Sequence, residues 1–326
     1  MKNVVFSVFL LLVSSIVALG VGEVALRAKN RSMQNYDIEM WRYAKELKVR
    51  SDNPLLGHEH VPSRAETLQS VEIRTNESGL RGSKVAAPSP DKRRILFLGS
   101  SVTLGWGVPE AETITQRIEK MFAKDGETVE VLNAGIGNYN APRYVERFLT
   151  RMTDLAPTDI VIHYFLRDAE VLDAGGGNWL LRNSQLAVTV WIAFSRYFGK
   201  ASEKTLEQHY RDVYRPDAQG YKDMLVALDR LAKYSREKNV RLYLAMTPDV
   251  HDLVDYKFEF VHKSVAGVAA GIGAKYVDLL PSMRNLTPKE LWSMPGDPHP
   301  NGLGHQKMAE ALYPALRLKP PATPAQ

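Results

Sequence analysis

The chain has 326 residues, of which 44% are hydrophobic and 24% are charged. This balance is that of an ordinary globular protein and excludes a disordered, collagen-like or coiled-coil chain. The 42 lysine and arginine residues exceed the 37 acidic ones by a net charge of +5, with no basic block, so nucleic acid is not an expected partner. Because the chain contains no cysteine, disulfides, thiol catalysis and thiolate metal sites are excluded.

The N-terminal region contains an uncharged apolar run, residues 4–22, which follows Lys2. Its length suits a short membrane span, and the core of a signal peptide has the same pattern. We expect residues 1–27 to be an uncleaved signal-anchor rather than a cleaved signal peptide, because the hydrophobic pattern continues through residues 24–26. A buried core helix is the third interpretation. The rest of the chain is then expected outside the cytoplasm, periplasmic or extracellular, and secreted if the segment is cleaved.

A polar stretch separates this run from the main domain. Residues 28–50 have helical character and are expected to form a stalk within a small irregular segment, residues 28–91. Residues 71–75 alternate between apolar and polar side chains, which is typical of a strand. The main domain is expected over residues 92–318, and the Pro- and Ala-rich residues 319–326 are expected to be a disordered tail.

The main domain alternates between strands and helices. Short apolar runs predict strands at residues 94–98, 129–132, 160–164, 241–246 and 276–278, and helical spacing predicts helices at residues 113–122, 141–152, 219–238, 258–272 and 302–316. Such alternation predicts an α/β fold of three layers, in which helices cover both faces of a five-stranded parallel sheet. Ligands of such sheets bind beyond the carboxyl ends of the strands.

One insertion, at about residues 169–218, interrupts the alternation. Residues 179–198 are strongly apolar, but Arg182 and Arg196 bracket too short a stretch to cross a membrane. Three interpretations remain open: a lid, a helix on a membrane surface, or ordinary packing over the core. Packing over the core is favoured, because apolar helical stretches are most often part of a core.

Polar residues that suit acyl chemistry follow the first three strands. Ser101 lies on a tight turn after the first strand, where its hydroxyl and the next backbone N–H groups would face the sheet edge. Gly137 and Asn138 follow the second strand, in a turn that can aim an N–H group inward. Arg167 follows the third strand and can stabilise an anion, or can simply pair with Asp168.

A second group of polar residues lies near the C-terminus. Asp297 and His299 are two residues apart, in a loop stiffened by prolines. An imidazole held by a carboxylate is the usual general base near neutral pH. Together with His305 the pair could instead bind a metal, but the spacing is not typical of metal ligands, so no metal is expected.

Together these residues resemble the SGNH hydrolases, the GDSL-like lipases and esterases, over roughly residues 93–316. The Gly-Asp-Ser block of that family is matched by residues 99–101, and its last block by Asp297 and His299. The resemblance implies a flavodoxin-like α/β/α fold. It also implies that Ser101 is the nucleophile, His299 the base and Asp297 the carboxylate that orients the base.

The resemblance also implies an oxyanion site. Backbone N–H groups of Ser101 and of Asn138 or Gly137 would hold the oxyanion, and Asn138 is preferred because it precedes a Tyr-Asn pair. Arg167 replaces the asparagine of the third block of the family. Because arginine is also a hydrogen-bond donor, we expect it to substitute for that asparagine. No cofactor is expected.

Three functions are compatible with these residues. The first is a membrane-tethered ester hydrolase that acts on acyl esters, with O-acetyl groups of an envelope or extracellular polysaccharide as the expected substrate. The second is a polysaccharide O-acyltransferase that uses the same triad. The third is a non-catalytic glycan-binding protein on a degenerate hydrolase fold, which a separation of more than about 4 Å between Ser101 and His299 would favour.

Overall fold

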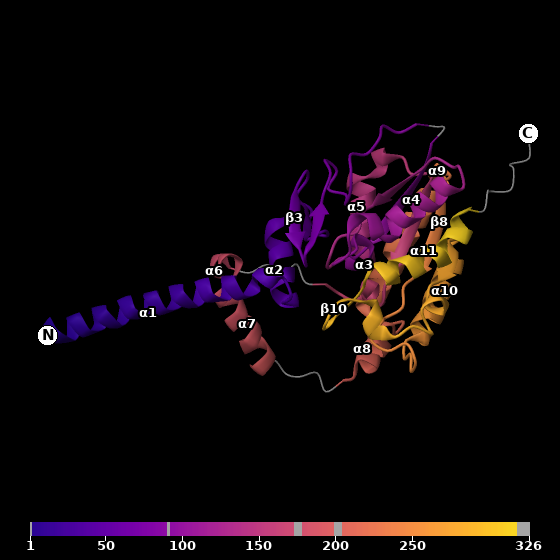
Figure 1. Ribbon diagram of the computed structural model, residues 1–326. Helices are drawn as coiled ribbons and strands as arrows, with labels where there is room; N and C mark the ends of the chain where they lie inside the picture. The colour runs from indigo at the N-terminus through magenta and orange to yellow at the C-terminus, as the bar shows by residue number, and fades with distance from the viewer. Residues whose placement is uncertain (1, 90–91, 173–177, 199–203, 318–326) are drawn as a thin grey trace, which may run out of the picture.

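The computed structural model describes residues 2–89, 92–172, 178–198 and 204–317. Its centre is a five-stranded parallel sheet with the strand order β6-β5-β7-β8-β9, which confirms the predicted fold class (Figure 1). The strands are β5 (Arg93–Gly99), β6 (Val129–Asn133), β7 (Asp159–Tyr164), β8 (Arg241–Met246) and β9 (Lys275–Asp278). Every residue of β7 is buried, as expected for a central strand covered on both faces.

Helices cover both faces of the sheet. On one face, α4 (Ile114–Lys124) packs against α11 (Gly302–Arg317). On the other, α5 (Ala141–Arg151), α9 (Gln219–Lys238) and α10 (Glu259–Ile272) lie next to one another. The chain steps from β5 to β6 toward one edge of the sheet, whereas the later connections, from β6 to β7 and from β7 to β8, step toward the other edge. Because such crossovers are right-handed, α4 lies on the opposite face of the sheet from α5 and α9.

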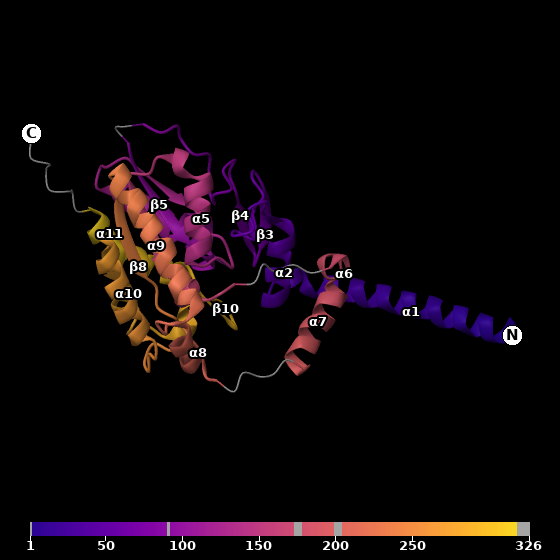
Figure 2. The same ribbon diagram turned by 180° about the vertical axis from the view of Figure 1, so that it is seen from behind.

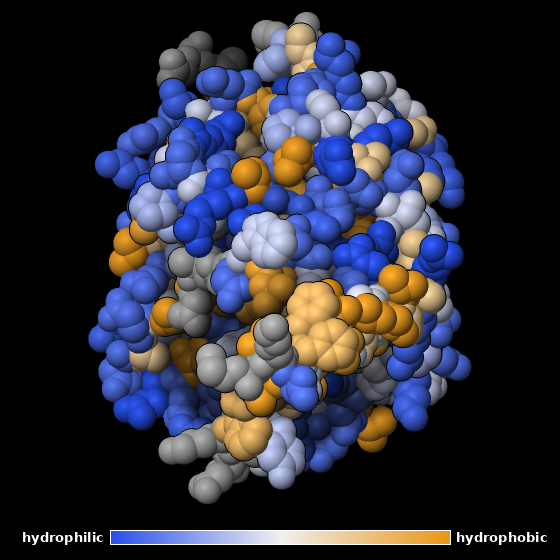
Figure 3. Space-filling view, turned by 90° about the vertical axis from the view of Figure 1, so that its left-hand side faces the viewer, coloured by the Kyte–Doolittle hydropathy of each residue, from blue (hydrophilic) through white to orange (hydrophobic). Residues whose placement is uncertain are grey.

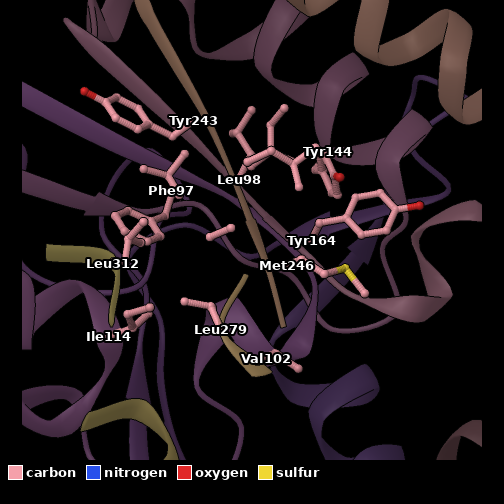
Figure 4. Close-up of a cluster of buried hydrophobic side chains, with 14 of the residues drawn as sticks. Phe97, Leu98, Val102, Ile114, Tyr144, Tyr164, Tyr243, Met246, Leu279 and Leu312 are labelled. Carbon is pink, nitrogen blue, oxygen red and sulfur yellow. The ribbon is translucent and has the colours of Figure 1, made fainter. Parts of the chain in front are cut away.

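The main hydrophobic core lies between the sheet and these helices. Figure 4 shows Phe97 and Leu98 of β5 among side chains from β7, β8 and four helices. The three tyrosines labelled in this cluster, Tyr144, Tyr164 and Tyr243, are also buried. Because the side chains of each strand alternate between the two faces, the apolar runs of the sequence supply both halves of this core.

The N-terminal part begins with α1 (Lys2–Lys29), which projects away from the rest of the molecule, here called the body, in Figures 1 and 2. It continues with α2 (Tyr36–Glu46) and two antiparallel hairpins. The first hairpin pairs β1 (Lys48–Arg50) with β2 (His58–His60), and the second pairs β3 (Ala65–Leu68) with β4 (Val71–Arg74). The strand predicted at residues 71–75 is therefore β4, and the segment is more regular than its sequence indicates.

This N-terminal segment packs against the main domain through a second hydrophobic cluster. The cluster contains buried side chains from α2, from β3 and β4, and from the chain that follows β5: Tyr43, Leu47, Leu68, Ile73, Leu104 and Trp106. The segment before residue 92 thus shares a core with the domain that follows it. The predicted division of the chain at residue 92 stays a prediction, and the predicted tail, residues 319–326, lies outside the described residues.

The insertion contains α6 (Trp179–Asn183), α7 (Gln185–Phe198) and α8 (Leu206–Val213). Helix α7 contacts α1 and α6. It lies near the C-terminal end of α1 and not over the sheet (Figures 1 and 2). Most of its side chains are exposed, and only Gln185 and Val188 are buried. The favoured interpretation, packing over the core, therefore does not describe α7.

Candidate active site

Ser101 is the first residue of the short helix α3 (Ser101–Leu104), directly after β5. Gly99 allows this sharp turn, because a Cβ at that position would lie 2.8 Å from the backbone oxygen of His163 in β7 and would also overlap Thr103. A larger residue at position 99 would therefore force α3 away from the sheet. The turn places the Ser101 side chain at the carboxyl edge of the sheet, where the sequence predicted it.

His299 lies next to Ser101, although 198 residues separate them. Ser101 Oγ is 2.8 Å from His299 Nε2, within hydrogen-bond range. His299 belongs to a small hairpin formed by β10 (Trp292–Met294) and β11 (Asp297–Pro300). This distance is well below the separation of about 4 Å beyond which a non-catalytic, degenerate site would be favoured.

Asp297 holds the other side of the His299 ring. Its Oδ1 lies 2.5 Å from His299 Nδ1 and also accepts a 3.1 Å hydrogen bond from the His299 backbone N–H. The structure thus brings together the three residues that the sequence singled out, in the order hydroxyl, imidazole, carboxylate. This is the arrangement that a serine nucleophile and its general base require.

The other oxygen of Asp297 is held by residues that the sequence did not indicate as partners. Asp297 Oδ2 accepts hydrogen bonds from Gln69 Nε2 at 2.7 Å and from Trp106 Nε1 at 3.1 Å. Burial raises the pKa of the Asp297 carboxyl, but the bonds from His299 and Gln69 outweigh burial and hold that pKa below its ordinary value. Asp297 is therefore an ionised, fully buried carboxylate at neutral pH.

Gln69 reaches this position from the turn between β3 and β4. Gln69 and Ser70 both have positive φ, 48° and 63°, as a two-residue hairpin turn requires. The backbone N–H of Gln69 donates to Glu39 Oε2 in α2 at 2.7 Å, which ties the turn to the preceding helix. Sequence inspection gave no signal for this contact, because it depends on how the hairpin packs.

The turn after β6 carries the candidate oxyanion donors Gly137 and Asn138. The Gly137 N–H already donates to the Tyr43 hydroxyl at 2.9 Å, and the Gly137 oxygen accepts from Lys48 Nζ at 2.7 Å. These bonds fix the turn, and Asn138 next to it has a φ of 64°. In the described part of the chain no acceptor is found for the Asn138 N–H, so Asn138 is the candidate that we retain.

Arg167 follows β7 and lines the same pocket as Ser101. Its Nε donates to Glu170 Oε2 at 3.0 Å, and about half of its side chain is exposed. Burial lowers the pKa of the Arg167 guanidinium, but Glu170 outweighs that effect and raises it above its usual value, so Arg167 stays charged. Asp168 points elsewhere and accepts from the Tyr144 hydroxyl, so the pairing of Arg167 with Asp168 that the sequence left open is not observed.

The pocket beside Ser101 and His299 has a volume of about 410 Å³. Tyr36 of α2 lies on its wall, with its ring stacked 6.1 Å from that of His299. His305, by contrast, is buried away from the pocket and accepts from the backbone N–H of Ile114 at 3.0 Å. Over the residues that the structure describes, no cluster of three or more His, Asp or Glu side chains is arranged to hold a metal.

A second aspartate–histidine pair lines the same pocket. Asp249 and His251 follow β8 with the spacing of Asp297 and His299. His251 Nδ1 lies 2.8 Å from Asp249 Oδ1, and the His251 backbone N–H donates to the same oxygen at 3.0 Å. This repeated Asp-x-His pattern at a strand end is a signal that sequence inspection could have found.

Solved structures with a similar fold include two esterases. The acetylxylan esterase Axe2 from Geobacillus stearothermophilus is 15% identical, with a TM-score of 0.46, and the match covers 73% of this chain and 98% of that one. The psychrotrophic esterase EstA from Pseudoalteromonas sp. is 16% identical, with a TM-score of 0.42, and the match covers 69% of this chain and 100% of that one. No curated protein sequence matches the chain.

The sequence itself matches the model of a known family. The match covers residues 97–307, which is more than half of the 326 residues. It includes the turn with Ser101 and the hairpin with Asp297 and His299. The chain therefore belongs to the GDSL-like lipase/acylhydrolase family.

Proposed function

We propose that the protein is a serine esterase in which Ser101 is the nucleophile, His299 the general base and Asp297 the carboxylate that orients it. The observation that carries the proposal is the 2.8 Å distance between Ser101 Oγ and His299 Nε2, with Asp297 directly behind the ring. A nucleophile and base within hydrogen-bond reach, with the base oriented by a third group, are typical of serine acyl transfer.

The reaction would proceed in two steps. His299 takes the proton of Ser101 as the hydroxyl oxygen attacks the ester carbonyl, and then gives that proton to the departing alcohol. Water, deprotonated by His299, then attacks the acyl-serine ester; the bond between the acyl carbon and Ser101 Oγ breaks, His299 returns the proton to Ser101 Oγ, and the acid leaves. The buried carboxylate of Asp297 stabilises the imidazolium that forms in each step.

The tetrahedral intermediates carry a negatively charged oxygen that needs donors. The backbone N–H groups of Ser101 and Asn138 and the guanidinium of Arg167 are the groups that we assign to it. The Gly137 N–H is engaged by Tyr43, so Gly137 would act by holding the turn that presents Asn138. Arg167 would supply the side-chain donor, and its charge would favour the oxyanion.

The pocket supports a short acyl group on a polar alcohol as the substrate. Its wall combines apolar side chains with charged and polar ones, among them Arg167, Glu170, His209 and His251. A long acyl chain would remove water from these groups, which is costly for charged side chains even though they pair with Glu170 and Asp249. Together with the half-buried aromatic ring of Tyr36, this lining suits an O-acetylated sugar of an envelope or extracellular polysaccharide.

Transfer to a second alcohol is the alternative, and the Asp249–His251 pair favours it. A second oriented imidazole in the pocket could bind or deprotonate an acceptor hydroxyl independently of His299. Release of p-nitrophenol in a single burst, followed by turnover only when an acceptor sugar is added, would identify a transferase. Steady hydrolysis without an acceptor would identify a hydrolase.

We also propose that α1 anchors the protein in a membrane, with the catalytic domain outside the cytoplasm. Helix α1 is long and apolar enough to cross a bilayer, and its apolar window has no contact with the body that would bury it. A C-terminal alkaline phosphatase fusion, active only outside the cytoplasm, tests the orientation. An inactive fusion combined with a fluorescent cytoplasmic reporter would contradict it.

The catalytic proposal is tested on the full chain in detergent, with p-nitrophenyl acetate and p-nitrophenyl octanoate. We expect the acetate to be turned over faster, and activity to fall by at least about 1000-fold in Ser101→Ala and in His299→Ala. A fluorophosphonate probe should label Ser101 in the parent protein. Ser235→Ala is a matched control, because Ser235 lies on α9 with a buried hydroxyl that lacks a hydrogen-bond partner in the described structure.

Two outcomes would contradict this assignment. Activity that survives in Ser101→Ala would mean that another residue is the nucleophile. A folded parent that neither turns over esters nor reacts with the probe would support the non-catalytic, glycan-binding interpretation.

A further inference from the structure

Helices α6 and α7 expose a set of large apolar side chains that no described part of the chain covers. The exposed residues are Trp179, Leu180, Val190, Trp191, Phe194, Tyr197 and Phe198. Within α7, Trp191 stacks on Phe194, and Phe194 contacts Phe198 with ring centroids 4.5 Å apart. These three rings form a continuous aromatic face, which for a surface exposed to water would be unusual.

The N-terminus of α7 is attached to α1 through one acidic side chain. The carboxylate of Glu23 accepts hydrogen bonds from the backbone N–H groups of Gln185 and Leu186, at 3.0 and 2.8 Å, and from the hydroxyl of Ser184 at 2.8 Å. Glu23 thus caps α7, because a carboxylate satisfies the free N–H groups and the dipole of a helix start. Since Glu23 directly follows the apolar run, α7 begins at the point where that run ends.

Further contacts hold α7 on the side of the body. Asn30 Nδ2 donates to Gln185 Oε1 at 2.9 Å, and Arg196 pairs with Asp37 of α2 at 2.6 Å. At 3.6 residues per turn, Phe194 lies on the face of α7 nearly opposite to Arg196. The aromatic face is therefore the one that points away from α2 and the catalytic domain.

The orientation of α7 follows from Figures 1 and 2. In both views α7 runs across the axis of α1, starting where α1 meets the body. Figure 3 looks along α1 from its free end, and apolar side chains gather around the middle of that face and below it. If α1 crosses a bilayer, α7 lies in the plane of its surface, at the level of Glu23.

We propose that α6 and α7 form a lipid-contact surface, with the aromatic face of α7 inserted into the interface of the bilayer that α1 spans. Tryptophan and tyrosine prefer this interface, and exposed basic residues near it, Arg27, Lys29, Arg31 and Arg182, suit the phosphates of the headgroups. The inference rests on the proposed anchoring by α1, and adds a second, in-plane contact to it.

This surface sets the position of the active site relative to the membrane. Helix α2 carries Tyr36, which stacks on His299, and Trp41, whose Nε1 donates to Leu181 in α6 at 2.7 Å. Through the Arg196–Asp37 pair the same helix holds the end of α7. One rigid helix thus joins the lipid-contact surface to the pocket, which holds the pocket at a constant height above the bilayer.

The absence of cysteine in the chain allows a direct test. Single cysteines are introduced at Trp191, Phe194 and Phe198 of the full chain, labelled with an environment-sensitive fluorophore, and placed in nanodiscs of phosphatidylcholine and phosphatidylglycerol. Val226→Cys and Val254→Cys are matched controls, because these valines are 63% and 86% exposed on other parts of the body. Val13→Cys, inside α1, reports on the membrane span itself.

We expect labels on α7 to be quenched by spin-labelled lipids and shielded from aqueous iodide, while labels at the two control valines show the reverse. Iodide access at α7 equal to that at Val226 would overturn the proposal. So would shielding from both quenchers, which would mean that a protein covers this face. If the label at Val13 is also in water, the anchoring by α1 fails; if only the α7 labels are in water, the lipid-contact surface alone fails.

Discussion

The amide of Gln69 donates a 2.7 Å hydrogen bond to the buried carboxylate of Asp297, across 228 residues of sequence. Gln69 lies outside the part of the chain that matches the family model, residues 97–307, whereas Asp297 lies inside it. A hairpin from the N-terminal segment therefore completes the environment of the residue that orients His299. The segment between α1 and the main domain is therefore part of the candidate active site.

Replacing Gln69 by Met is expected to lower kcat by about 10-fold and to change KM little. The variant keeps the volume of the side chain but removes the donor to Asp297, and a hydrogen bond to a charged group contributes about 1.5–3 kcal/mol. The same bond satisfies a buried carboxylate, so its loss should also lower the melting temperature by a few degrees. Steady-state kinetics and thermal unfolding of the full chain separate the two effects.

The control for this variant lies on the same turn. Asparagine tolerates the positive φ of position 70, so Ser70→Asn should keep the turn and leave the hydrogen bond from Gln69 to Asp297 intact. It should therefore have parental kinetics. A lower melting temperature with an unchanged kcat in Gln69→Met would show a structural role for Gln69 rather than a role in positioning Asp297.

Arg167→Ala is expected to lower kcat by about 100- to 1000-fold, the usual effect of removing one oxyanion donor. Arg167→Asn, which restores the residue of the family block, should retain more activity than the alanine variant because asparagine also donates. Arg211→Ala serves as the control, since Arg211 is an exposed residue of α8 paired with Glu207. An unchanged kcat in Arg167→Ala would exclude the guanidinium from the oxyanion site.

The pKa of the His251 imidazole is expected to fall in Asp249→Asn. The hydrogen bond that His251 donates to Asp249 raises this pKa above its ordinary value of 6.5, outweighing burial. The pair therefore stabilises the fold fully below pH 6.5, and that contribution is lost as the pH rises through the raised pKa. An NMR titration of labelled histidine rings measures the shift. Asp255→Asn, which removes a charge that is paired with Lys257 instead, should leave the His251 titration unchanged.

His251→Gln tests the role of the second pair in turnover. If His251 activates the incoming water or alcohol, the burst of p-nitrophenol should keep its rate while the following steady phase slows by about 100-fold. Stopped-flow absorbance with p-nitrophenyl acetate resolves the two phases. Equal slowing of burst and steady phase would instead place His251 in substrate binding.

Gly99→Ala is expected to destabilise the fold by about 1–3 kcal/mol, because the new methyl group would press against the backbone of β7. Gly267→Ala in α10 is the opposite control: nothing lies within 4 Å of its position, and alanine in a helix interior is favoured by about 0.5–1 kcal/mol. Urea unfolding of both variants in detergent measures the free energies. A neutral Gly99→Ala would mean that the turn before Ser101 adapts without cost.

Much of the fold could be predicted from the sequence, because the patterns that mark strands and helices are local. Apolar runs such as that of β5 and the helical spacing of α9 predict the strands and helices of the main domain, and their alternation predicts the parallel sheet. Ser101, Asp297 and His299 stand at strand ends or in stiff loops near the C-terminal edge of that sheet. The edge of the parallel sheet predicts only the place of Ser101, because Asp297 and His299 lie on a separate hairpin; their meeting with Ser101 was implied by the resemblance to the SGNH hydrolases.

Only the tertiary structure decided what surrounds these residues. The contacts of Gln69 and Trp106 with Asp297, of Tyr36 with His299 and of Glu23 with α7 join segments that are far apart in the chain. No periodicity or turn residue marks such pairs, since each depends on the packing of one element against another. The sequence by itself therefore determined the sheet and the candidate site residues Ser101, His299 and Asp297, whereas packing decided how the N-terminal segment supports them.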